Sequence, residues 1–404
     1  MVIKILFVSE DITLAQIVRL KALADSLESE PYEVHFASGS FDERLLGNAA
    51  YRHWPIEVID KAYADSAVAE CRRLYETSTL EAYVEDDLRV IDEVQPDLIV
   101  GDLRLSLPIS ARVAGIPFAA LINAYWSTEV DREEFPVPDH PLEPRVGYDA
   151  MRTVFRWIRP WVFRQFAQPV NQLRQRYGLK PIGSLQALLT YGDYVLFPDT
   201  PQLVPLRSQA PNQYFLGPIH WSPAAAVPAS LEPVLGGDYI YATLGSSGRA
   251  NKIDTLLEGL ARLPLPVILS SAGRFQRDVP DNVYLEQWLP GETLAKHAKL
   301  VISNGGSSTS YQSLAQGTPV LGIASNLDQY LCMQSLEKLG VARHLRGASF
   351  TSAEVTQAVS MMAYDRGFDS RAQAIGKAMA TYNYRERFRS FLRQVFQESR
   401  LFAR

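Results

Sequence analysis

Residues 303–329 read SNGGSSTSYQSLAQGTPVLGIASNLDQ. The preceding letters KLVIS predict a buried strand, residues 304–308 a turn at its carboxyl end, and TSYQSLAQG a helix that ends at Gly317. Open α/β sheets bind ligands outside the carboxyl ends of their strands. Glycines let the backbone approach a ligand, and free amides at a helix start favour an anion. The hydroxyls of Ser307, Ser308 and Thr309 add donors. The stretch therefore suits an anion site, and an ordinary glycine-rich turn between strand and helix stays open as the alternative.

The second half of the stretch adds a polar pair. PVLGIAS predicts another strand, which delivers Asp328 and Gln329 to the same edge of the sheet. An acid beside an amide offers acceptors and donors that suit vicinal sugar hydroxyls. Alone, this dipeptide is typical of a solvated turn. Downstream of the glycine turn, it predicts that a phosphate and a sugar bind side by side.

The same alternation of short apolar runs and helical patterns covers the chain. IKILFV, EVHFAS, PDLIVGD and PFAALINA read as buried strands in the first half, and DYIYATLG, PLPVILSSA and VYLEQW continue the pattern after residue 237. We predict two α/β domains with parallel sheets: residues 1–216 and 238–380, joined by a Pro- and Ala-rich linker at 217–237. Residues 381–404 predict an amphipathic helix that could pack on either domain.

Composition narrows the class of protein. The chain has 404 residues, 47% of them hydrophobic, and a net charge of -5, which argues against a nucleic-acid partner. Cys71 and Cys332 lie in different halves, so a disulfide framework is not expected. His53, His140, His220 and His344 lack metal-ligand spacing. The start of the chain reads as a strand and not as a signal peptide, and no apolar run suits a membrane span. We expect a soluble, cytoplasmic protein that needs no metal.

Three segments carry a resemblance to a family. WLP at 288–290, NGGSSTSYQSLAQGTPVLGI and NLDQ resemble the donor-binding signature of the nucleotide-sugar glycosyltransferases of GT-B fold, which include plant UDP-glycosyltransferases and bacterial macrolide glycosyltransferases. The resemblance implies two Rossmann-like, doubly wound domains that face each other across a cleft. It also implies inverting transfer of a sugar from a UDP- or dTDP-linked donor, held by the C-terminal domain, to a hydroxyl of a small molecule. No further cofactor is implied.

The resemblance assigns donor contacts at the nucleotide. Trp288 would stack on the nucleobase, and the backbone of Leu289 would read its edge. Asn304 stands where the family usually has a histidine at the diphosphate, and Gln312 stands where many members have a glutamate for the ribose hydroxyls. Both departures keep polar groups and lose charge.

The remaining donor contacts match the family's pattern. The diphosphate turn would consist of Gly306, Ser307, Ser308 and Thr309, and Asp328 with Gln329 would bind the sugar hydroxyls. TLGSSGR at 243–249 resembles a further turn that closes over the phosphates, which assigns Ser246 and Ser247 to the donor.

The catalytic base departs from the family. Aligning the helix RLKALADSL places Gln16 where a histidine usually deprotonates the acceptor, and an amide does not accept a proton at neutral pH. Glu10 and Asp11 lie in the same loop, and a partly desolvated carboxylate can act as a base. Asp102 matches the acid that orients the family's histidine; it could act directly or pair structurally with Arg104. We predict Asp11 as the base.

Two other functions stay open at this stage: a sugar-nucleotide isomerase of the same fold, and a catalytically silent sugar-nucleotide binder. A dehydrogenase and a P-loop nucleotide-binding protein are disfavoured, because the first strand lacks the glycines of a dinucleotide site and no Walker sequence is present.

Residues 151–178 mix arginines with Phe155, Trp157, Trp161 and Phe163. This helix could lie on a membrane surface, line an apolar acceptor pocket or cover the N-terminal core.

Overall fold

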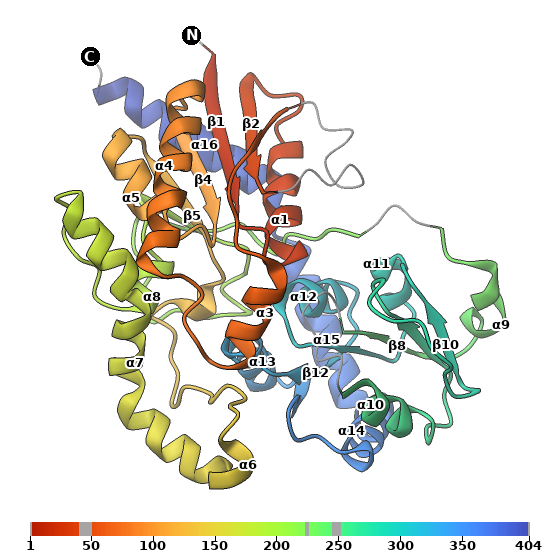
Figure 1. Ribbon diagram of the computed structural model, residues 1–404. Coiled ribbons are helices and arrows are strands. Elements are labelled where there is room, and N and C mark those ends of the chain that lie inside the picture. Colours follow the sequence, from red (N-terminus) through yellow and green to blue (C-terminus); the bar gives the residue numbers. More distant parts are fainter. Residues whose placement is uncertain (1, 40–50, 223–225, 245–251, 403–404) are drawn as a thin grey trace. The chain divides into compact units, whose positions relative to one another are not determined.

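The computed structural model describes residues 2–39, 51–222, 226–244 and 252–402 (Figure 1). The chain divides into two compact units. Unit 1 contains Met1–Glu133, Thr153–Ile219 and Tyr382–Arg404, and unit 2 contains Glu134–Arg152 and His220–Thr381. The short segment Glu134–Arg152, from the first half of the sequence, therefore groups with unit 2.

Unit 1 is built on a seven-stranded parallel sheet with the order β3-β2-β1-β4-β5-β6-β7. Its strands are β1 (Ile3–Ser9), β2 (Tyr32–Ser38), β3 (Arg52–Pro55), β4 (Leu98–Asp102), β5 (Phe118–Leu121), β6 (Tyr194–Phe197) and β7 (Gln213–Phe215). Its helices are α1 (Leu14–Asp25), α3 (Lys61–Ala69), α4 (Thr77–Val94), α5 (Leu107–Ala114), most of α7 (Tyr148–Arg176), α8 (Leu185–Leu189) and α16 (Tyr384–Phe402).

Helices cover both faces of this sheet. Successive residues of a strand point to opposite faces, so neighbouring residues of β1 pack against different helices. Ile5 and Phe7 of β1 pack with α1 and α16, whereas Leu6 and Val8 pack with α4 and α5. The long apolar runs of the sequence reflect this double burial. The C-terminal helix, for which the sequence left the choice of domain open, packs in the core of unit 1 through Phe388 and its neighbours.

Unit 2 repeats the design with a six-stranded parallel sheet of order β10-β9-β8-β11-β12-β13. Its strands are β8 (Ile240–Thr243), β9 (Val267–Ser270), β10 (Val283–Glu286), β11 (Leu300–Ser303), β12 (Val320–Ala324) and β13 (Ala342–Arg346). Its helices are α6 (Glu143–Val146), α9 (Glu232–Leu235), α10 (Ile253–Leu260), α11 (Gly291–Ala295), α12 (Ser307–Ala315), α13 (Leu327–Lys338), α14 (Ser352–Tyr364) and α15 (Arg366–Met379).

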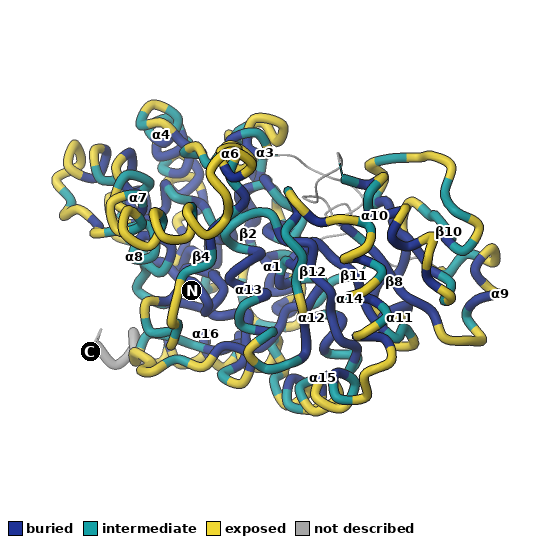
Figure 2. The backbone as a smooth tube through the Cα atoms, turned by 90° about the horizontal axis from the view of Figure 1, so that it is seen from below, coloured by how far each residue is buried: buried dark blue, intermediate teal, exposed yellow. Residues whose placement is uncertain are grey.

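Most residues of both sheets are buried, and the exposed residues lie mainly in helices and loops (Figure 2). The prediction of two parallel, doubly wound α/β domains is confirmed. No helix in the described ranges is long and apolar enough to cross a bilayer.

Candidate donor and catalytic sites

The glycine-rich turn lies where the sequence predicts it, between the end of β11 and the start of α12. Gly305 has a φ of 78°, a conformation that glycine adopts without strain. Its amide donates to Ser303 Oγ at 3.0 Å, and the Gly306 amide donates to Asn304 Oδ1 at 3.1 Å. Asn304 therefore shapes the turn with its side-chain oxygen.

Helix α12 begins directly after this turn, and Gly306 at its N-cap provides no side-chain cap. The first amides of a helix have no partner within the helix and carry its positive dipole end. Ser307 is buried, while Ser308 and Thr309 are half-buried at this end. The predicted diphosphate residues thus come together at the first turn of α12, which has the donors and the field to bind an anion.

The next strand brings Asp328 and Gln329 to the start of α13. Gln329 is 3% exposed, and its Oε1 accepts from the Ser325 amide at 2.8 Å. The Gln329 amide donates to Asn326 Oδ1 at 3.0 Å, which completes a capping box. Gln329 therefore caps its own helix, whereas Asp328 is half-buried in the first turn.

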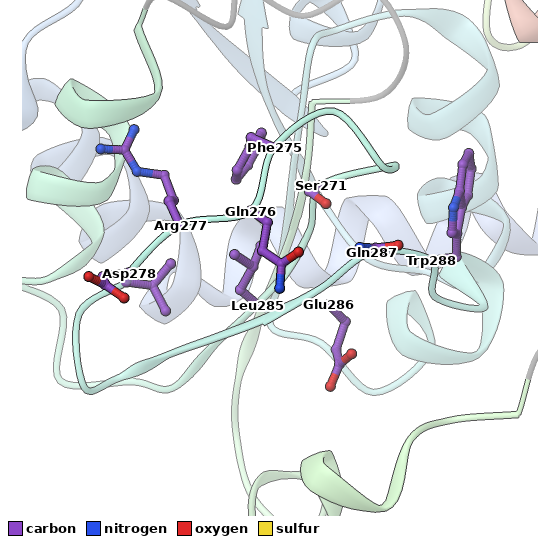
Figure 3. Close-up of a pocket in the computed structure, with 10 residues that line it drawn as sticks. Ser271, Phe275, Gln276, Arg277, Asp278, Leu285, Glu286, Gln287 and Trp288 are labelled. Carbon is purple, nitrogen blue, oxygen red and sulfur yellow. The ribbon is translucent and has the colours of Figure 1, made fainter.

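Trp288 follows β10 and is 43% exposed, so part of its indole ring is open to a ligand. It lines a pocket of about 670 Å³ together with residues of the loop after β9 (Figure 3). Leu289 is 3% exposed and packs in the core with Tyr241 and Ile268. The side chain of Leu289 is therefore part of the core of unit 2.

The loop after β9 is a part of this site that sequence reasoning missed. Ala272 has a φ of 50° and Gly273 a φ of 73°, two successive left-handed residues. A Cβ on Gly273 would lie 3.5 Å from the Trp288 ring, and the buried Ser271 Oγ has no hydrogen-bond partner in the described ranges. Backbone strain is typical of functional sites. The small residues SSAG at the carboxyl end of the predicted strand PLPVILSSA were the available signal.

The remaining predicted donor contacts are Gln312 at the ribose and Ser246 with Ser247 at the phosphates. Gln312 is half-buried, and its Nε2 donates to the Trp221 carbonyl at 3.1 Å, so its amide group is held by unit 2 itself. Ser246 and Ser247 lie outside the described residues.

The candidate catalytic residues of unit 1 gather at the carboxyl ends of β1 and β4. Ser9 pairs with Asp102 in the register of the sheet, and the Glu10 amide approaches the Asp102 carbonyl at 3.4 Å. Glu10 and Asp102 are fully buried, whereas Asp11 is half-buried. Among these three acids, Asp11 is the one that is not fully buried, and its Oδ1 atom is itself buried.

Asp102 is held by a partner that sequence reasoning missed. Arg19 Nε lies 3.0 Å from Asp102 Oδ2, and Arg19 Nη2 lies 2.9 Å from Oδ1. Arg19 Nη1 also donates to Asn123 Oδ1 at 2.8 Å. The alternative of a pair with Arg104 is wrong, because Arg104 contacts Glu10 and Asp87 instead.

Glu10 belongs to that second buried network. Tyr83 donates to Glu10 Oε1 at 2.9 Å, and Arg104 Nη1 lies 3.2 Å from Oε2. Burial raises the pKa of Glu10 to about 7, although Arg104 and the Tyr83 hydrogen bond pull the pKa down. Burial also raises the pKa of Asp87, the other carboxylate on Arg104.

Gln16 is 3% exposed and lies in the first turn of α1. Its Oε1 accepts from the Thr13 amide at 2.9 Å as part of a capping box. The position that resembles the family's histidine thus holds a helix-capping side chain.

Known proteins resemble the chain in both sequence and fold. Residues 254–384 match the model of the erythromycin biosynthesis protein CIII-like C-terminal domain. The PGL/p-HBAD biosynthesis glycosyltransferase of Mycobacterium tuberculosis is 40% identical over 93% of this chain and 88% of its own. The PGL/p-HBAD biosynthesis rhamnosyltransferase of Mycobacterium bovis is 41% identical over 93% and 84%. An inactive PGL/p-HBAD biosynthesis glycosyltransferase of the same species is 40% identical over 68% and 72%.

Solved structures share the fold. Spinosyn forosaminyltransferase SpnP has a TM-score of 0.69 at 16% identity and covers 97% of this chain and 99% of its own. The Streptomyces glycosyltransferase SsfS6, complexed with thymidine diphosphate, has a TM-score of 0.67 at 14% identity and covers 97% and 99%. The two parallel sheets thus have the GT-B fold, and the relatives of about 40% identity show that the chain is a glycosyltransferase. Within that class, the chain belongs to the family of the PGL/p-HBAD biosynthesis glycosyltransferases.

Proposed function

We propose that the enzyme transfers a sugar from a nucleoside-diphosphate sugar to a hydroxyl of a small apolar or aromatic acceptor, with inversion at the anomeric carbon. One observation supports binding of such a donor most strongly. The first turn of α12 has no side-chain cap, and it follows a strand of the same sheet whose other strands lead to Trp288 and Asp328. These groups match the three parts of such a donor: an anionic diphosphate, a planar base and a polyhydroxylated sugar.

The reaction is a single displacement. The acceptor oxygen forms a bond to the anomeric carbon, and the bond from that carbon to the diphosphate oxygen breaks. The diphosphate leaves with the electron pair, and the first amides of α12 and the hydroxyls of Ser308 and Thr309 stabilise its charge. The acceptor proton passes to a carboxylate in unit 1.

We assign the role of base to Asp11. Gln16 is an amide that caps α1, and Asp102 is bound at both oxygens by Arg19. Glu10 is fully buried against Tyr83 and Arg104. Asp11 is half-buried beside these groups, and a carboxylate in such a setting can be tuned toward a base.

Product analysis tests the proposal. The full-length protein is incubated with UDP- and dTDP-linked hexoses, including a rhamnosyl donor because one relative is a rhamnosyltransferase, and with a panel of phenols and aliphatic alcohols. Glycosylated acceptor of inverted configuration, with an equivalent of nucleoside diphosphate, is the expected result. An isomerase would convert the sugar nucleotide without acceptor. A catalytically silent protein would bind nucleoside diphosphate in calorimetry and give no product. This outcome is included because one relative is named as inactive.

A further inference from the structure

The first half of α7 carries an exposed apolar surface. Val154 is 52% exposed, Trp157 80%, Ile158 43% and Trp161 61%. Their spacing of three, four and seven residues from Val154 places all four on one face of the helix. We call these four residues the apolar stripe. Single exposed hydrophobic residues are common, but four on one helix face, two of them tryptophan, form a contiguous patch.

Core packing does not account for the stripe. The second half of α7 buries Phe163, Ala167 and Val170 in unit 1. At about 100° per residue, these positions lie roughly opposite the stripe. In Figure 2, most of the tube in the first half of α7 has the colour of exposed residues. The helix therefore has one apolar face for the core of unit 1 and a second apolar face that points to solvent.

The charge of α7 is strongly positive. The helix contains six arginines and a single acid, Asp149, which lies before the stripe. Arg156 and Arg164 are exposed within or next to the stripe's segment. Arg132 lies close to Arg159, and burial together with the charge of Arg159 lowers the pKa of Arg132 to about 10. The segment of α7 that carries the stripe is therefore rich in arginine, and one of these arginines, Arg152, lies 3.9 Å from Glu134 outside the helix.

We propose that the apolar stripe of α7 docks the enzyme on an anionic lipid surface. A helix with tryptophans on one face and arginines on the other lies in the plane of a bilayer interface. Indole rings favour the headgroup level, where the ring is apolar and the N–H meets water. Arginines near the surface attract anionic headgroups. A second copy of the chain is a poorer occupant, because pairing two stripes would bring two sets of arginines together.

Vesicle flotation tests the docking with the full-length protein. The wild type should float with phosphatidylcholine–phosphatidylglycerol vesicles and much less with phosphatidylcholine alone. The double variant Trp157→Ser with Trp161→Ser should reduce partitioning by about tenfold or more, and Arg156→Glu by about fivefold. Tyr364→Ser, which alters a 60% exposed aromatic side chain on α14 of unit 2, is the matched control and should bind like the wild type.

Four outcomes overturn the proposal. The first two concern the wild type: no flotation at low salt, or equal flotation with both lipid compositions. The other two concern the variants: equal flotation of the wild type and the double variant, or loss of flotation in Tyr364→Ser as well. A concentration-dependent dimer in sedimentation that the double variant abolishes, without vesicle binding, would assign the stripe to a second copy instead. Circular dichroism at matched temperature checks that each variant is folded.

Discussion

Arg19 and Asp102 form a bidentate ion pair inside unit 1, with Arg19 Nε 3.0 Å from Oδ2 and Nη2 2.9 Å from Oδ1 of the carboxylate. Both side chains are buried, at 6% and 0% exposure. A buried charge without its partner costs several kcal/mol. The geometry therefore identifies Asp102 as the counterion of Arg19.

Asp102→Asn should lower the free energy of unfolding by about 3 kcal/mol, because it leaves Arg19 buried without its counterion. Urea denaturation followed by circular dichroism measures the loss. Asp25→Asn is the control: it breaks the more exposed i,i+4 pair with Lys21 and should cost below about 0.5 kcal/mol. Unchanged stability with a hundredfold slower turnover would instead show that Asp102 is the base.

Asp11→Asn should lower turnover about 10²- to 10⁴-fold at saturating donor, because the amide keeps the size of the side chain and loses the proton acceptor. The affinity for nucleoside diphosphate, measured by calorimetry, should not change. Asp92→Asn, on the exposed face of α4, serves as the control. Turnover like that of the wild type in Asp11→Asn would remove Asp11 from the mechanism.

The sequence was most informative where the structure depends on neighbours in the chain. The Asn304 turn and the start of α12 follow from a strand pattern, two glycines and a run of small residues. The capping boxes of Thr13 with Gln16 and of Asn326 with Gln329 have the local spacing of three that marks such a box. This spacing marks both glutamines as capping residues, whereas the resemblance to the family implies ligand and catalytic positions for them.

The ion pairs were out of reach for a physical reason. Arg19 and Asp102 are 83 positions apart, and Glu10 and Arg104 are 94 positions apart. Several acids and arginines lie near the carboxyl ends of β1 and β4, and only the packed sheet and helices select which charge meets which. Sequence spacing offered the nearby Arg104 as one alternative partner of Asp102, whereas the folded chain brings Arg19 there from α1.

Asp328→Ala should separate sugar binding from nucleotide binding. Removing the half-buried carboxylate should cost about 1.5 to 3 kcal/mol in kcat/KM for the intact donor, the range for hydrogen bonds to a charged group. Calorimetry with UDP or dTDP should give the affinity of the wild type. An equal loss for the donor and for the free diphosphate would show that Asp328 only supports the start of α13.

Trp288→Ala is the reciprocal change. Loss of a stacking face should weaken free nucleoside diphosphate by about 1 to 3 kcal/mol, the range measured for aromatic–base stacking. The intact donor should lose the same amount, because the base is common to both ligands. Unchanged affinity for the free diphosphate would place the base elsewhere in unit 2.

The free energy of unfolding should fall as the pH rises, because Glu10 is buried in the folded chain. Its pKa is raised from an ordinary 4.5 to about 7 in the folded chain, so the folded state holds this proton more tightly than the unfolded state. Its contribution to stability is therefore fully present below about pH 4.5 and is lost as the pH rises to about 7, by roughly 3 kcal/mol at most. Asp87, on the other side of Arg104, shifts in the same direction.

Glu10→Gln isolates the part that belongs to Glu10, because the variant keeps Asp87. Urea denaturation between pH 4.5 and 8 should show a shallower decline than in the wild type. Tyr83→Phe changes the same carboxylate in the opposite sense: it removes the hydrogen bond that lowers the pKa of Glu10, so the decline should extend to higher pH. Circular dichroism at pH 5 checks that both variants are folded. Parallel stability curves for Glu10→Gln and the wild type would show that Glu10 keeps an ordinary pKa in the folded chain, and that Arg104 and Tyr83 together offset its burial.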